Sequence, residues 1–345
     1  MAWYADDMYQ SLFAQLIGAG DVPLLQTISP CKSDDPVCNC PRQLSGRSDV
    51  LMFELLLSEN LTLSNQQVDA ILSLSESIPE SDVIFLSASS SNHYDEMQAM
   101  FHNLHTVVSP LMPDMRVVFF DIGLTETQRI QTEKYCRCHV IRFPFEKFRP
   151  LLEDRFCYFW KPLIIRALIG KVRKGLVYQD SSVRWTSHIK PLLERGAAFG
   201  LQYHVSDVPP NVSVDRLKQM SNFFGEELCA FRHFPELDGS NGIFGNLPFV
   251  IRALIEPWAK CALDAACMCP DQPEAAGSLG DQLSDGHRSH GFDRATLKIV
   301  AAKLFDNALR RVITLDNKAI DTVRRGLAMP DYFNSIVNKS AGHEK

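Results

Sequence analysis

The sequence predicts an α/β protein built on a mostly parallel sheet with helices on both faces. Three apolar runs of strand length, at 82–90, 115–124 and 175–181, each end in small polar or acidic residues. Segments with helical periodicity separate them. The chain has 345 residues, of which 46% are hydrophobic, enough for a large core. Strands that alternate with helices favour a parallel sheet that is covered on both sides.

The first eighty residues differ from the rest. Residues 29–45 are rich in Cys, Pro and Asp. Ser64 and Gln67 then form a capping-box pattern before an apolar helical stripe, and Pro79 follows that stripe. We therefore expect residues 1–80 to be an N-terminal appendage, made of a Cys-rich loop and a helix.

From residue 82 the elements follow in order. The strand at 82–90 precedes a helix at 93–109, whose apolar face comprises Met97, Met100, Phe101, Leu104 and Val108. After the second strand, Thr125 and Gln128 are expected to cap a helix that ends at residue 135. A third strand is expected at 138–145. The next helix is expected to begin at Pro162 and to end at Gly175, before the fourth strand.

The remaining elements are a helix, turn and strand at 188–204, a helical stretch from 246 to 267, a Gly/Ser/Asp/Pro-rich loop at 270–286, and a helix that ends at 305. The pattern gives a sheet domain at 81–310 and a helical tail at 311–345.

Composition restricts the partners and the compartment. A net charge of −6 argues against a nucleic-acid surface, and no apolar run reaches the length of a membrane span. The ten cysteines are even in number, which fits disulfides, and Asn60, Asn211 and Asn338 lie in glycosylation sequons. A secretory (Golgi) lumen or extracellular location is favoured. The alternatives are a cytoplasmic protein with free core cysteines, and a zinc site, which the Cys-x-Cys spacing disfavours.

Several predicted strands end in polar residues at one edge of the sheet. These are the loop from Ser87 to Asn92, then Asp121, and then Asp180. The carboxyl edge of an open parallel sheet is where such folds bind ligands. Because no glycine-rich phosphate loop follows the first strand, neither a dinucleotide dehydrogenase nor a P-loop enzyme is supported.

Seven segments occur together in an order that resembles the DUF1647 proteins of nematodes and other invertebrates. They are "SASSSNHYDE", "FFDIGLTETQ", "FPFEKF", "WKPLIIRAL", "YQDSSVRW", "EPWAKCALDAACMCP" and "HRSHGFDRATL". That group is similar to the GT-A nucleotide-sugar transferases. The resemblance spans roughly residues 65 to 305 and implies a GT-A-like Rossmann-type sheet and glycosyl transfer.

The resemblance implies a site for a nucleotide-sugar donor. Its expected donor-binding residues are Ser87, Ser89, Asn92, Asp121, Lys161, Ser182 and Arg184. Metal-dependent members of that fold place an Asp-x-Asp pair after a central strand, whereas this chain has Asp180-Ser181-Ser182. One carboxylate and a hydroxyl form a poor site for Mn²⁺ or Mg²⁺, so metal dependence is left open. Asp180 and His287 are the candidate ligands. No organic cofactor is indicated.

Asp180 and Asp293 are the candidate catalytic residues. Asp293 could act as a general base toward an acceptor hydroxyl, although Arg294 stands where the resemblance leads us to expect Gln. Structural roles remain as alternatives: Asp180 could cap a turn, Asn92 could be a helix N-cap, and Asp293 could favour a helix start.

The expected function is transfer of a sugar from a nucleotide-sugar donor to a hydroxyl of a glycan or glycoprotein. The alternative is a catalytically silent protein of the same fold that binds nucleotide sugars or glycans. An expected diphosphate leaving group would be neutralised by a cation or by fixed basic side chains such as Lys161 and Arg184.

Overall fold

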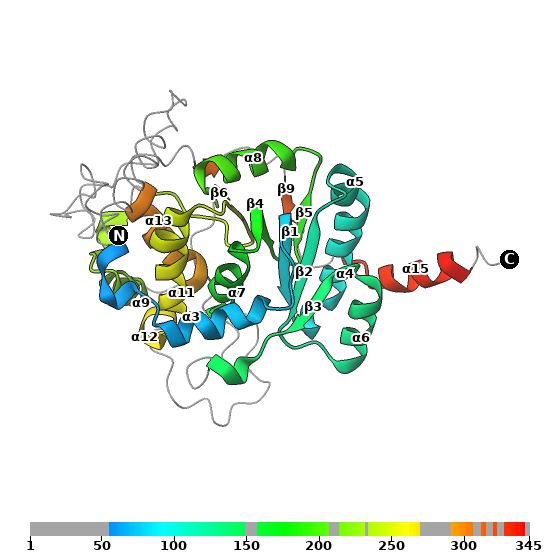
Figure 1. Cartoon of the computed structure of the whole chain (residues 1–345), viewed down its shortest axis with the longest axis horizontal. Helices are drawn as coiled ribbons and strands as arrows, with labels where there is room; N and C mark the ends of the chain where they lie inside the picture. Colours follow the sequence, from blue (N-terminus) through cyan, green and yellow to red (C-terminus); the bar gives the residue numbers. More distant parts are fainter. Residues whose placement is uncertain are drawn as a thin grey trace.

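A computed structural model describes residues 55–148, 157–206, 214–231, 234–269, 291–305, 312–314, 320–322 and 328–341. The predicted Cys-rich loop at 29–45, the loop at 270–286 and His287 lie outside these residues. Figure 1 shows a central sheet with helices packed on both of its faces, as the sequence predicts.

The sheet has seven strands in the order β3-β2-β1-β4-β7-β6-β8. The strands are β1 (Ser81–Ser89), β2 (Arg116–Asp121), β3 (His139–Arg142), β4 (Val172–Gln179), β6 (Leu201–His204), β7 (Asn241–Phe244) and β8 (Ile313–Thr314). Only β7 runs against its neighbours, since it pairs antiparallel with both β4 and β6. A second, two-stranded sheet joins β5 (Val183–Trp185) to β9 (Ile320–Thr322).

The helices are α3 (Asn65–Leu72), α4 (Tyr94–Asn103), α5 (Ser109–Leu111), α6 (Glu126–Tyr135), α7 (Trp160–Ile169), α8 (Ile189–Phe199), α9 (Val214–Phe223), α10 (Pro248–Val250), α11 (Glu256–Ala262), α12 (Ala265–Met268), α13 (Phe292–Phe305) and α15 (Tyr332–Ala341). Both predicted capping boxes are present: Ser64 with Gln67 begins α3, and Thr125 with Gln128 begins α6.

Alternate residues of the central strands enter two different cores. Ile84 and Leu86 of β1 face a core that includes α3, α7, α11 and α13. Val83 and Phe85 face a second core that includes α4, α8 and Phe333 of α15. The strands are therefore buried on both faces, which explains their nearly continuous apolar sequences.

The expectation that α7 ends at Gly175 is wrong. The helix ends at Ile169 with Gly170 as its cap, and β4 already begins at Val172. Gly175 lies inside β4, where an added Cβ atom would stand 2.9 Å from Leu193 Cδ1. Its role is therefore close packing against α8 and not the termination of a helix.

The predicted domain boundaries at residues 80 and 310 stay a prediction. The described parts of both flanking segments nevertheless pack into the shared cores. Leu61 and Ile71 lie in the core on the α7 face, and β8 extends the sheet beside β6.

The described cysteines are all in disulfides, as the even count suggested. Three of the bonds join described residues: Cys136–Cys138, Cys157–Cys269 and Cys261–Cys267. This pairing leaves none of the described thiols as a zinc ligand. In the part of the chain that the structure describes, no helix is long and apolar enough to cross a bilayer.

Candidate active site

The strand order creates a switch point between β1 and β4. The chain runs from β1 to β2 and β3 on one side, and then returns to place β4 on the other side of β1. At the carboxyl ends of these strands, Ser89 pairs with Asp121, and Asp180 directly follows β4. Open α/β sheets bind ligands at such a position, so the predicted edge is also the edge that the topology favours.

Lys161, in the first turn of α7, is the centre of a charged cluster at this edge. Its Nζ lies 2.9 Å from Asp293 Oδ2 and 3.3 Å from Asp180 Oδ1, and it donates to the Gly239 carbonyl at 3.0 Å. The rings of Tyr158 and Tyr178 lie 4.6 and 5.3 Å from the ammonium. The Lys161 side chain is only 4% exposed, so these contacts replace its hydration.

The acids determine the charge state of this lysine. Burial pulls the pKa of Lys161 down, but Asp180 and then Asp293 raise it by more, so the net shift is upward. With one cation and two carboxylates, this cluster of three residues carries a formal charge of −1 at neutral pH.

Asp180 is the most open member of the cluster. Its side chain is 32% exposed, whereas that of Asp293 is 5% exposed. The backbone N–H of Asp180 donates to the Ser240 carbonyl at 2.7 Å, and the Tyr178 hydroxyl donates to its carboxylate. Burial raises the pKa of Asp180, and this outweighs the lowering effects of Lys161 and Tyr178. A partly exposed carboxylate with a raised pKa is suited to accepting a proton.

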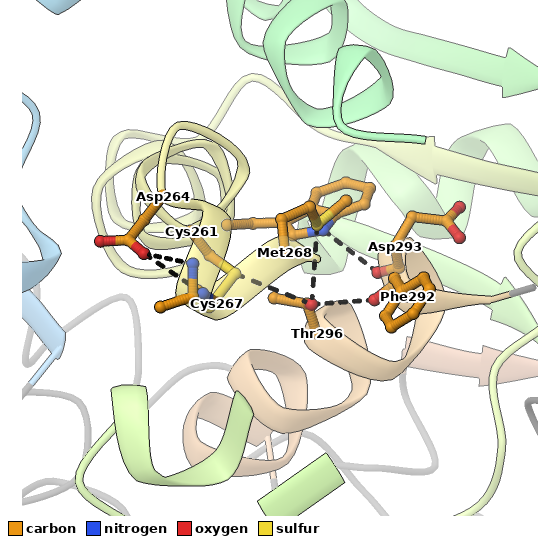
Figure 2. The surroundings of a disulfide bond; sticks show 9 residues. Cys261, Asp264, Cys267, Met268, Phe292, Asp293 and Thr296 are labelled. Carbon is orange, nitrogen blue, oxygen red and sulfur yellow. Dashed lines mark hydrogen bonds between the residues drawn. A yellow bond between two sulfur atoms is a disulfide. The ribbon is translucent and has the colours of Figure 1, made fainter. Parts of the chain in front are cut away.

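Asp293 reaches the cluster from the first turn of α13. The Trp258 indole N–H donates to its backbone carbonyl at 3.2 Å, which fixes the start of the helix against α11. Figure 2 shows the carboxylate of Asp293 pointing away from the Cys261–Cys267 disulfide and from Thr296. Two acids that are 113 positions apart in the sequence therefore share one ammonium.

The predicted donor residues on β1 and β2 lie at the same edge of the sheet, but in different settings. Ser87 is buried, and its hydroxyl has no hydrogen-bond partner among the described residues. Asp121 Oδ1 accepts the N–H groups of Gly123 and Leu124 at 2.8 and 2.7 Å, which forms the turn after β2. Ser89 is buried at the end of β1.

The expectation that Asn92 is a helix N-cap is wrong. A short 3₁₀ turn at Ser91–His93 precedes α4, and the Asn92 side chain accepts from the Ser90 hydroxyl at 2.5 Å. The Asn92 amide is therefore part of the exposed loop at the ligand edge of the sheet.

Arg184 and Ser182 lie just beyond β4. The Arg184 guanidinium donates to the carbonyls of Val183 and Glu96 at 2.8 and 2.9 Å, and to that of Ser181. Burial lowers the pKa of Arg184 to about 10. Ser182 is partly exposed in the turn between β4 and β5.

Sequence reasoning missed the polar groups that surround the two acids. Tyr178 lies within the apolar run at 175–181, yet its hydroxyl donates to the Asp180 carboxylate. Gly239 contributes a backbone carbonyl, which no side-chain pattern reveals. Burial raises the pKa of Tyr203 well above its usual value, as do the nearby charges of Asp293, Asp238 and Asp180, in that order. Tyr203 and Asp238 therefore belong to the same neighbourhood.

Whether a divalent cation binds beside Asp180 stays a prediction. Among the described residues, no group of three or more His, Cys, Asp or Glu is arranged to hold a metal ion. The Asp180 carboxylate already pairs with the Lys161 ammonium at 3.3 Å. The proposed contribution of His287 lies outside the described part of the chain.

Similar solved structures are glycosyltransferases, at low similarity. An active-site mutant of LgtC has 12% identity and a TM-score of 0.37, with 74% of this chain and 95% of that chain covered. Mouse xyloside xylosyltransferase 1 in its apo form has 12% identity and a TM-score of 0.35, with coverages of 69% and 85%. The bifunctional glycosyltransferase WbbM has 8% identity and a TM-score of 0.34. This chain spans only 38% of WbbM, and 55% of this chain is covered.

A comparison with curated proteins finds no match. Residues 50–166 match the model of the family described as "Protein of unknown function (DUF1647)", and the resemblance inferred from the sequence is confirmed over that segment.

Proposed function

We propose that this protein is a glycosyltransferase that moves a sugar from a nucleotide-sugar donor to a hydroxyl of a glycan or glycoprotein. The observation that carries the proposal is the convergence of Asp180 and Asp293 on Lys161 at the switch point of a parallel sheet. Such an edge is where a nucleotide binds in this class of fold, and two acids beside it supply the groups that transfer chemistry needs.

In this proposal the residues divide by position. Ser89, Asn92 and Asp121 lie at the ends of β1 and β2 and face the nucleoside. Asp180 lies beside the transferred sugar and the acceptor. Because it is the more exposed acid, it accepts the proton of the attacking hydroxyl or a hydrogen bond from the sugar.

Lys161 contributes to the donor site through the acids. Its ammonium already binds Asp180, Asp293 and the Gly239 carbonyl, so direct contact with a diphosphate requires one of these bonds to be exchanged. We therefore propose that Lys161 positions the two carboxylates. Positive charge for the leaving group then comes from a bound cation, or from basic residues such as Arg184 after a change of hydrogen-bond partners.

A binding protein without turnover is the second candidate. The observation that favours it is the same full engagement of Lys161, together with the loss of the second acid of the Asp-x-Asp pattern at Ser182. Such a protein would retain affinity for nucleotide sugars and show no hydrolysis. The disulfides fit either candidate in a secretory lumen.

The test is a panel of UDP- and GDP-sugars incubated with the purified chain, with and without Mn²⁺, while donor hydrolysis and transfer are followed. The site variant is Asp180→Asn, and its control is Asp82→Asn, an aspartate at the opposite end of the sheet that pairs with Arg173 and Lys174. We expect Asp180→Asn to lose turnover by about 100-fold or more, as for a lost acid or base, and Asp82→Asn to keep it.

Saturable binding of a donor without hydrolysis or transfer would favour the silent binding protein. Full turnover in a folded Asp180→Asn variant would remove this carboxylate from the site.

A further inference from the structure

Cys136 and Cys138 form a disulfide within a Cys-Arg-Cys sequence, at the junction of α6 and β3. The bond closes a loop with a single intervening residue, so it restricts the unfolded chain far less than a bond between distant cysteines. Chain cross-linking is therefore a weak reason for this bond to exist. The Cys157–Cys269 bond, with a sequence separation of 112, restricts the unfolded chain much more.

The surroundings of the bond are open on one side. Cys136 is buried, whereas Cys138 is partly exposed and Arg137 between them is exposed. Arg137 has a φ of 51°, a left-handed conformation that costs free energy for a residue with a Cβ atom. Lys134 lies on the same last turn of α6. An anionic thiolate can therefore approach the partly exposed Cys138, which directly follows the exposed Arg137 in the chain.

The buried half of the bond has a defined environment. The Cys136 carbonyl accepts from His105 Nε2 at 2.7 Å, and His105 Nδ1 lies 2.7 Å from the Tyr332 hydroxyl. Cys136 is thus held in place by contacts that do not involve its sulfur. Loss of the disulfide would leave the backbone at this position supported.

The Cys261–Cys267 bond provides a contrast within the same chain. Both cysteines are fully buried between α11 and α12, and the Cys261 sulfur faces the Thr296 hydroxyl at 3.8 Å, as Figure 2 shows. An attacking thiolate has no open approach to a bond whose two residues are both buried.

We propose that Cys136–Cys138 is a thiol–disulfide exchange site that accepts electrons from a dithiol reductant. The thiolate of the reductant attacks Cys138 Sγ, the bond between the two protein sulfurs breaks, and Cys136 leaves as a thiolate that takes up a proton. The second thiol of the reductant then displaces Cys138 from the mixed disulfide. In total, two electrons and two protons pass to the protein, and the reductant becomes a disulfide. A bond with one partly exposed sulfur next to an exposed arginine has the properties of a labile disulfide.

The experiment uses the intact chain in native buffer with dithiothreitol as the probe. Samples are alkylated at intervals and each cysteine is followed by peptide mass spectrometry, while circular dichroism reports the fold. We expect Cys136 and Cys138 to be labelled at least about tenfold faster than Cys261 and Cys267, with the fold retained. Labelling of the four together, or of Cys136 and Cys138 only after unfolding, would overturn the proposal, as would mapping of either cysteine to another partner.

Two variants test the reason for the reactivity. Arg137→Ala removes the cation beside Cys138, so reduction should become several-fold slower and less sensitive to salt. Arg129→Ala removes a cation of the same helix that is already bound to Glu126, and it should not alter the rate. If the two variants behave alike, the cation beside the bond has no role and the electrostatic part of the argument is wrong.

Discussion

Replacing Lys161 by Met tests the charged cluster most directly. The substitution keeps much of the length of the side chain but removes the ammonium that Asp180 and Asp293 share. It leaves two carboxylates close together without their counter-ion. The cation–π contacts with Tyr158 and Tyr178 are lost as well.

The expected loss follows from the exposure of the two acids. Removing one partner of a buried ion pair costs about 3–5 kcal/mol, because the remaining charge stays buried without compensation. Asp293, at 2.9 Å and 5% exposed, meets that description. Asp180 is 32% exposed and can be rehydrated, so most of the loss arises from Asp293. We therefore expect Lys161→Met to reduce the free energy of unfolding by about 3–5 kcal/mol.

The assay is urea unfolding at pH 7 with the disulfides intact, in which the midpoint falls and the slope is unchanged. The double variant Lys161→Met, Asp293→Asn should recover part of the loss, because it removes the uncompensated charge. The control is Lys174→Met, whose exposed side chain pairs with Asp82 and should leave stability unchanged.

A loss below about 1 kcal/mol, equal to that of a surface ion pair, would contradict a desolvated cluster. So would a double variant that is less stable than Lys161→Met, since it would mean that Asp293 is not left as an uncompensated charge.

Two further predictions concern other parts of the fold. Burial lowers the pKa of His105 from its usual 6.5 despite its bond to the Cys136 carbonyl, so the folded state disfavours the protonated ring. Stability from this group is present above pH 6.5 and is lost as the pH falls through the lower folded-state pKa. Urea unfolding between pH 7.5 and 5 should therefore show that the free energy of unfolding falls less in His105→Gln than in the wild type. Equal falls in the two proteins would refute the assignment. In β7, an alanine Cβ at Gly242 would lie 2.4 Å from Tyr203 ring atoms, so Gly242→Ala should cost about 1–3 kcal/mol by urea unfolding. Gly170→Ala has open space around its Cβ and serves as the control, and equal stability of the two variants would show that the ring yields freely.

Local patterns predicted the parts of the fold that local physics determines. The capping boxes at Ser64 and Thr125 begin helices because each satisfies two backbone donors within four residues. The predicted end of α7 was several residues too late, because two glycines follow the apolar helix and the first of them, Gly170, is the cap. The pairing that begins β4 is set by β1: the Ser81 N–H donates to the carbonyl of Lys171, before Gly175 is reached.

The site was predictable only in part, because several of its contacts join residues that are far apart in the sequence. Asp180 was found because the residue after a buried strand lies at the ligand edge of the sheet. Asp293 was a candidate through the family resemblance, but its position beside Asp180 depends on how α13 packs against α11. The Gly239 carbonyl and the Tyr178 hydroxyl carry no sequence signal, since one is backbone and the other lies within an apolar run.

The placement of Lys161 links the site to the stability of the fold. A cation in the first turn of α7 faces the positive end of the helix dipole, an unfavourable position for a buried ammonium. Asp180 and Asp293 offset this cost, so the acids that are proposed to act on substrate also hold α7, β4 and α13 together. Loss of activity in an Asp293 variant therefore cannot by itself indicate a catalytic role, because the fold is weakened too. Asp180, which is partly hydrated, is the acid at which chemistry and stability can be measured separately.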